Sequence, residues 1–65
     1  MTNMEVEMLE KAIIEDVKRY KDYVDRKVAF SVEFWYWRVD GMMWAYSIIT
    51  DTLMKDVYEK FGFEK

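Results

Sequence analysis

Hydrophobic positions in the first 26 residues recur at steps of three and four, which is the spacing of one face of an α-helix. The members of this stripe are Val6, Leu9, Ile13, Val17, Tyr20 and Val24. The opposite side carries acids placed four residues before bases, such as Glu7–Lys11, and these pairs are typical of a solvent-exposed helical face. The pattern therefore predicts a long N-terminal helix over residues 3–26.

The pattern changes in residues 28–50, VAFSVEFWYWRVDGMMWAYSIIT, where two β-prone runs flank Asp40-Gly41. An Asp-Gly pair between such runs is a strong signal for a tight hairpin turn. If these two residues form the turn, Trp37 lies opposite Trp44, and opposed aromatic side chains stabilise a strand pair. We therefore expect a β-hairpin over residues 28–50.

A short helix is predicted over residues 52–61, because Leu53, Val57 and Phe61 recur at steps of four. Thr50 or Asp51 can serve as its N-cap. Gly62 can adopt the left-handed conformation that ends a helix, which lets the next residue pack back on the last turn. The predicted fold is a small α+β domain, residues 1–65, with the order α-β-β-α.

The alternative for the second half of the chain is a single helix from about residue 43 to residue 61. Tyr46, Ile49, Leu53 and Val57 also fall at helical spacing. The β-branched run Ile48-Ile49-Thr50 argues against this helix, because such side chains lose χ1 freedom in a helix.

One face of the predicted hairpin is bulky and apolar, and we take it as the candidate interface. Its members are Trp35, Trp37, Val39, Met42, Trp44, Tyr46 and Ile48. The other face has small residues at Ala45 and Ser47, so we expect the helices to pack there and leave the bulky face open. That face would expose about 600–1,000 Å², which exceeds the largest apolar patch of a typical monomer. We therefore expect a homodimer or higher oligomer; in the alternative, the last helix covers this face and the aromatic residues form the core.

The amino-acid composition excludes several kinds of chemical site. The 65-residue chain has no histidine and no cysteine, which excludes disulfides and the usual zinc ligands, and it shows no recognisable catalytic set. We therefore expect no enzyme activity, no cofactor and no metal. Glu33, the one charged residue on the bulky face, is the candidate polar anchor. The lack of cysteine fits the cytoplasm, and no uninterrupted apolar run is long enough to span a membrane.

Binding is the function class that remains. We expect a non-catalytic protein-binding module, a small regulator or inhibitor of the kind encoded by phages and other mobile elements. One alternative is sequestration of a nucleotide or another small ligand by stacked aromatic rings. A further alternative is binding of single-stranded nucleic acid, but the net charge of −3 and the single arginine in residues 28–50 disfavour it.

Overall fold

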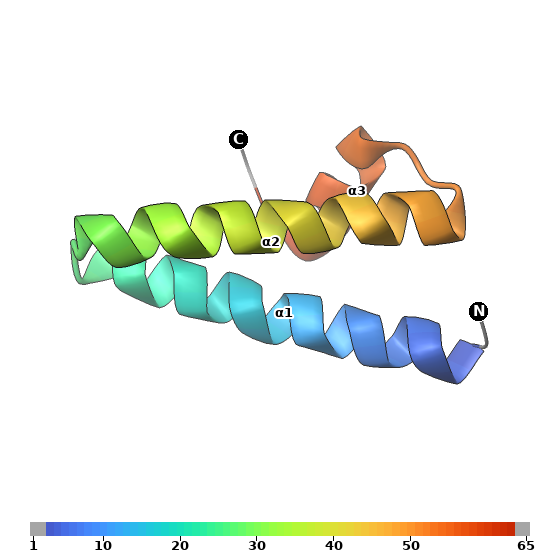
Figure 1. The fold of residues 1–65 in the computed structure, drawn as a ribbon, viewed down its shortest axis with the longest axis horizontal. Coiled ribbons are helices and arrows are strands. Elements are labelled where there is room, and N and C mark those ends of the chain that lie inside the picture. Colours follow the sequence, from blue (N-terminus) through green and yellow to red (C-terminus); the bar gives the residue numbers. More distant parts are fainter. Residues whose placement is uncertain (1–2, 64–65) are drawn as a thin grey trace.

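Three α-helices make up the part of the chain, residues 3–63, that the computed structural model describes, and this part contains no β-strand. The helices are α1 (Asn3–Asp25), α2 (Ala29–Thr50) and α3 (Met54–Phe61). Helices α1 and α2 lie side by side in opposite directions, and α3 turns back behind α2 (Figure 1). The fold is therefore a small helical bundle, and the prediction of an α+β fold with a β-hairpin is wrong.

The first and last helices lie where their periodicity predicts them. The C-terminal end of α3 is also as expected, because Gly62 has a φ of +66° and the Phe63 amide donates to the Tyr58 carbonyl at 3.0 Å. The Phe63 ring packs back on Tyr58, with their centroids 6.0 Å apart. The predicted N-cap is wrong, because Leu53 holds the N-cap position of α3 and no side chain caps this end.

The pattern of residues 28–50 is ambiguous because most of their positions are apolar. The run Phe34-Trp35-Tyr36-Trp37 contains no polar alternation, so it fits a period of 3.6 as well as a period of two. In the helix, an inner stripe of α2 packs against the other two helices. Its members are Tyr36, Val39, Met43 and Tyr46, and Val32 continues the same line at an open groove beside α1.

Asp40 and Gly41 lie in the middle of α2 and form no turn. The Asp40 carboxylate is buried, and it accepts a hydrogen bond of 2.7 Å from the Tyr58 hydroxyl of α3. Gly41 does not adopt a positive φ; among residues 3–63 the glycine that does is Gly62. A contact with a residue 18 positions away therefore overrides the local turn signal.

Helix α2 ends at Thr50, and a short loop separates it from α3. The alternative of one helix over residues 43–61 is therefore also wrong. Asp51 adopts the left-handed conformation, with φ 52° and ψ 47°. The Ser47 carbonyl accepts hydrogen bonds from the amides of Asp51 and Thr52, the second at 3.0 Å. The Thr50 hydroxyl donates to the Tyr46 carbonyl at 2.7 Å. The Thr50 side chain thus bonds to the backbone of its own last turn at the point where α2 ends.

The core lies where the three helices meet. Its buried apolar residues are Ile13, Val17, Val39, Met43, Tyr46, Val57 and Phe63. The Phe63 ring centroid lies 5.2 Å from that of Tyr20 and 5.4 Å from that of Tyr36, so Phe63 fills part of the space between α1 and α2. The molecule measures only 37 × 21 × 15 Å, and a helix with side chains is about 10–12 Å across. Each helix therefore keeps a wide face that no other helix covers.

Candidate functional site

Helix α2 carries a second apolar stripe on the side that faces away from the core. We call it the outer stripe; its members are Phe30, Phe34, Trp37, Gly41, Trp44 and Ile48. Their spacing alternates between four and three residues, which is the a and d pattern of a helix that packs lengthwise against another helix. The inner stripe has the same alternating spacing on the opposite side. One helix thus presents two lines of apolar side chains, and only one line is used within the chain.

The large side chains of the outer stripe are exposed to solvent. The exposed fraction is 85% for Phe30, 62% for Trp37 and 76% for Ile48, and about half for Phe34 and Trp44. On the scale of 150–250 Å² for one aromatic side chain, the stripe exposes about 500–800 Å². A typical monomer has a largest apolar patch of about 300–600 Å². The outer stripe is therefore large enough to mark an interaction surface.

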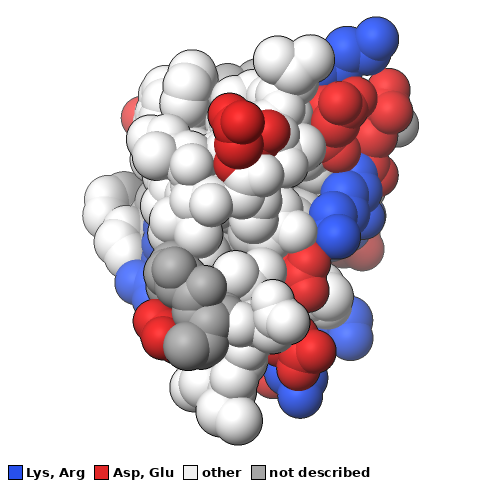
Figure 2. Space-filling view, turned by 90° about the vertical axis from the view of Figure 1, so that its right-hand side faces the viewer, with Lys and Arg blue, Asp and Glu red and all other residues white. Residues whose placement is uncertain are grey.

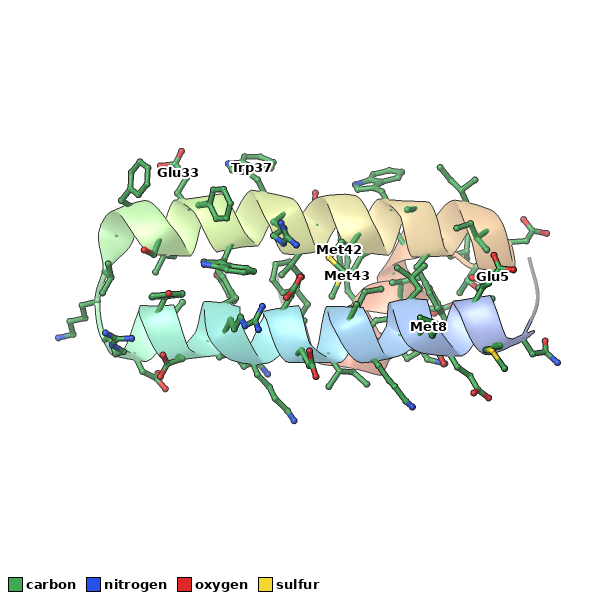
Figure 3. The ribbon with its side chains drawn as sticks, turned by 60° about the horizontal axis from the view of Figure 1, so that its bottom comes forward. Glu5, Met8, Glu33, Trp37, Met42 and Met43 are labelled. Atoms are coloured by element: carbon green, nitrogen blue, oxygen red, sulfur yellow. The ribbon has the colours of Figure 1, made fainter. Side chains whose placement is uncertain are left out.

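Charged groups lie mostly away from this surface. Viewed from the end where α2 finishes, acidic and basic groups crowd along one side of the molecule, and a wide uncharged surface lies beside them (Figure 2). Along α2, Glu33 borders the outer stripe on one side and Arg38 on the other. Glu33 and Trp37 point away from α1, whereas Met43 points toward it (Figure 3). Glu33, the predicted polar anchor, is thus an exposed residue at the border of the stripe.

The seven residues that the sequence placed on one hairpin face do not share a face of α2. Residues two apart on a helix point to nearly opposite sides, so the hairpin grouping is divided. Trp37, Trp44 and Ile48 belong to the outer stripe. Val39 and Tyr46 are buried in the core, Met42 is partly buried against it, and Trp35 is partly buried beside Tyr23.

Sequence reasoning missed two members of the exposed surface, Phe30 and Phe34. The hairpin placed both on the face that the helices were expected to cover, whereas the helix turns both toward solvent. A signal for them exists in the sequence, because the steps of four and three continue without a break from Phe30 to Ile48.

A cluster of arginine and aromatic side chains connects α1 and α2 around Trp35. The guanidinium carbons of Arg19 and Arg38 lie 5.5 and 5.3 Å from the Trp35 ring centroid. Both arginines also donate hydrogen bonds to the buried Asp16 carboxylate, at 3.3 and 3.2 Å. The Tyr23 ring is stacked on Trp35 at 6.3 Å. The Asp16 carboxylate pairs with both arginines and offsets one of their two positive charges, which weakens the attraction of the cluster for phosphates.

A polar junction joins all three helices near the other end of the bundle. The Tyr46 hydroxyl donates to Glu10 at 2.6 Å, and the Lys60 ammonium lies 3.0 Å from the same carboxylate oxygen. The hydrogen bonds from Tyr46 and Lys60 lower the pKa of Glu10. Burial, and then the hydrogen bond to Glu10, raise the pKa of Tyr46, and the hydrogen bond to Glu10 raises the pKa of Lys60. Each shift favours the protonation state that the group already has at neutral pH, so the junction suits a structural role better than proton transfer.

An open groove lies between α1 and α2 near the turn that joins them. Its volume is about 460 Å³, within the range of small-molecule sites. Its lining residues are Tyr20, Val24, Lys27, Ala29, Val32, Glu33 and Tyr36. The Tyr20 and Tyr36 rings are tilted by 54° and their centroids are 6.0 Å apart, so they do not form a parallel sandwich for a flat base.

The described residues contain neither a metal-binding cluster nor a membrane-spanning helix. Within residues 3–63, no three acidic, histidine or cysteine side chains are close enough to hold a metal ion. None of the helices described in this range combines the length and the apolar character needed to cross a membrane. The chain matches no protein-family model, and no curated protein and no solved structure matches it.

Proposed function

We propose that the protein is a non-catalytic protein-binding module and that the outer stripe of α2 is its binding surface. The supporting observation is the line of five large, exposed apolar side chains along α2, with Gly41 between the third and the fourth. Tryptophan and phenylalanine are enriched in the cores of protein interfaces. Such a surface suits a small cytoplasmic regulator or inhibitor that acts by contact with another protein, as many small proteins of phages and mobile elements do.

The charges around the stripe support a protein partner over two other partners. A helix that lies on an anionic membrane carries Lys or Arg along its polar border. Here one border carries Glu33, and Arg38 on the other border is paired with Asp16 at 3.2 Å. Nucleic acid is disfavoured for a similar reason, since Arg38 is the one basic residue of α2 and is paired with Asp16.

Site-specific photo-cross-linking in the native host tests the proposal. A photoreactive amino acid replaces Phe34 or Trp44 on the outer stripe, and in a matched control it replaces Lys18, which is exposed on α1. We expect protein adducts from the two stripe positions and none from the control. The proposal fails if the stripe positions give no adduct, or if the control gives the same adducts.

Small-ligand sequestration is a second candidate, because the groove beside Tyr20 and Tyr36 is large enough to hold a small molecule. The apolar lining favours an uncharged or weakly polar ligand over a nucleotide triphosphate. Amide chemical-shift mapping with adenosine and with simple aromatic compounds tests it. Shifts confined to residues near Val32 would support the candidate, and a spectrum that is unchanged at saturating ligand would remove it.

A further inference from the structure

Gly41 makes a notch in the middle of the outer stripe that nothing within the chain explains. Glycine is disfavoured inside a helix relative to alanine. A Cβ atom added at Gly41 would meet no other atom within 4 Å, so packing against α1 and α3 does not require a glycine. The notch lies between the bulky Trp37 and Trp44, each one helical turn away. A flat-sided partner would leave it empty, whereas a partner with a projecting side chain would fill it.

The stripe itself supplies a projecting side chain, Trp37, one helical turn from the notch. We propose that the occupant of the outer stripe is a second copy of this chain, with the two α2 helices antiparallel and Trp37 of each copy seated on Gly41 of the other. This proposal rests on the proposed function, because it names the partner for the same surface.

Antiparallel pairing of an a and d pattern places each a position opposite a d position of the other helix. With the two-fold axis at the level of residue 39, Trp37 of one copy faces Gly41 of the other. The remaining layers then also combine residues of unequal size. Phe30 faces Ile48, and Phe34 faces Trp44. Every layer contains at least one aromatic ring, and no layer contains two tryptophans.

The parallel arrangement matches these side chains poorly. It would place Trp37 opposite Trp37 and Trp44 opposite Trp44, with an empty layer of two Gly41 residues between them. Close packing of an interface core does not tolerate such a void between crowded layers.

Charges favour the parallel arrangement only weakly. A parallel pair would bring Glu33 of one helix near Arg38 of the other, but an exposed ion pair contributes little. Arg38 is also already 3.2 Å from Asp16 within its own chain. In the antiparallel pair the two Arg38 side chains approach each other, and Asp16 offsets their repulsion. We therefore take side-chain packing, rather than charge, to decide the orientation.

The area of the stripe matches what a stable dimer needs. Two copies that cover about 500–800 Å² each would together bury about 1,000–1,600 Å², close to the range of about 1,200–2,000 Å² for stable protein interfaces. A chain of 65 residues is marginal as a monomer, and oligomerisation is one of the usual ways in which such chains gain stability.

Light scattering over a wide concentration range tests the second copy. We expect the wild type to have twice the mass of the chain. The Gly41→Leu variant fills the notch, and we expect dimerisation to weaken by roughly ten-fold or more, the effect of losing one well-packed interface side chain. The control Lys18→Leu adds the same side chain to α1 and should leave the mass unchanged. Because leucine is a good helix former, circular dichroism should show that Gly41→Leu stays folded.

Cross-linking tests the orientation, because the chain has no cysteine of its own. Ser31→Cys and a mass-tagged Ala45→Cys variant are mixed and treated with a short thiol cross-linker. Antiparallel helices bring position 31 of one copy near position 45 of the other, whereas parallel helices separate them by about 21 Å along the axis. We expect the mixed product to dominate.

Each other outcome overturns a stated part of the reasoning. Products that join two Ser31→Cys chains or two Ala45→Cys chains, or stronger dimerisation of Gly41→Leu, would overturn the antiparallel arrangement. A wild type that stays monomeric at all concentrations would overturn the second copy. In that case, adducts of Phe34 or Trp44 with a different protein would keep the proposed function. Binding of the monomer to phosphatidylcholine vesicles without protein adducts would overturn both.

Discussion

Replacement of two isoleucines by alanine gives a matched test of the fold, because the same atoms are removed from opposite environments. Ile13 of α1 is completely buried in the core, whereas Ile48 of the outer stripe is 76% exposed. Ile13→Ala removes three carbon groups, worth about 0.8 kcal/mol each in transfer free energy, and leaves a cavity. We therefore expect the free energy of unfolding to fall by about 2–5 kcal/mol.

Ile48→Ala should have almost no effect on a monomer. About a quarter of the side chain is buried, so the transfer loss is roughly 0.5 kcal/mol. Alanine has the higher helix propensity, which offsets a similar amount. The expected change is within about 0.5 kcal/mol. For a chain of this size the total is about 3–10 kcal/mol, so the two variants should be easy to distinguish.

The assay is urea unfolding, followed by far-ultraviolet circular dichroism at two protein concentrations. If the stripe pairs with a second copy, the wild-type midpoint rises with concentration, and Ile48→Ala should reduce that dependence while it leaves the low-concentration value unchanged. Ile13→Ala should lower the midpoint at both concentrations. Equal losses for the two variants at low concentration, or a loss below about 1 kcal/mol for Ile13→Ala, would refute the assignment of the two faces.

Three further predictions concern polar contacts and the backbone. Because the hydrogen bond from Tyr46 lowers the pKa of Glu10, the ionised Glu10 stabilises the fold at neutral pH, and this stabilisation is lost as the pH falls through the folded-state pKa. In acid unfolding, the Glu10→Gln variant should therefore show a shallower loss of stability than the wild type below about pH 4.5. Tyr58→Phe removes the hydrogen bond to the buried Asp40 and should cost about 1–3 kcal/mol in urea unfolding, and an unchanged midpoint would contradict the role of this bond. Lys27 has a φ of +58°, so Lys27→Gly should raise the free energy of unfolding by up to about 1 kcal/mol, and a lower thermal midpoint would count against strain at this turn.

Helices α1 and α3 could be predicted from the sequence because the pattern of apolar and polar residues in each is unambiguous. In α1, apolar residues such as Ile13 and Val17 fall on one side and charged pairs on the other, so only one period fits. The end of α3 depends on Gly62 and Phe63, which act through neighbouring backbone groups. This C-cap signal acts within the last turn of the helix, and the structure retains it.

Helix α2 could not be predicted in the same way, because its apolar residues cover both sides and match two periods at once. The turn signal of Asp40-Gly41 is also local, but it loses to a partner that is distant in the sequence. Tyr58 holds the Asp40 carboxylate in the core, and the inner stripe gains burial against α1 and α3. Packing over the length of a 22-residue helix outweighs the preference of two residues for a turn.

For the candidate site too, one part could be predicted from the sequence and the other part depended on the tertiary structure. The sequence by itself indicated that residues 28–50 hold many large apolar side chains, but it left open whether they form an exposed surface or a covered core. The residues that form the surface depend on whether residues 29–50 follow a period of two or of 3.6. Only the packing of α2 on its neighbours decided between these two periods. The helix buries Val39 and Tyr46 and exposes Phe30 and Phe34, because residues that share a face at a period of two are separated at a period of 3.6.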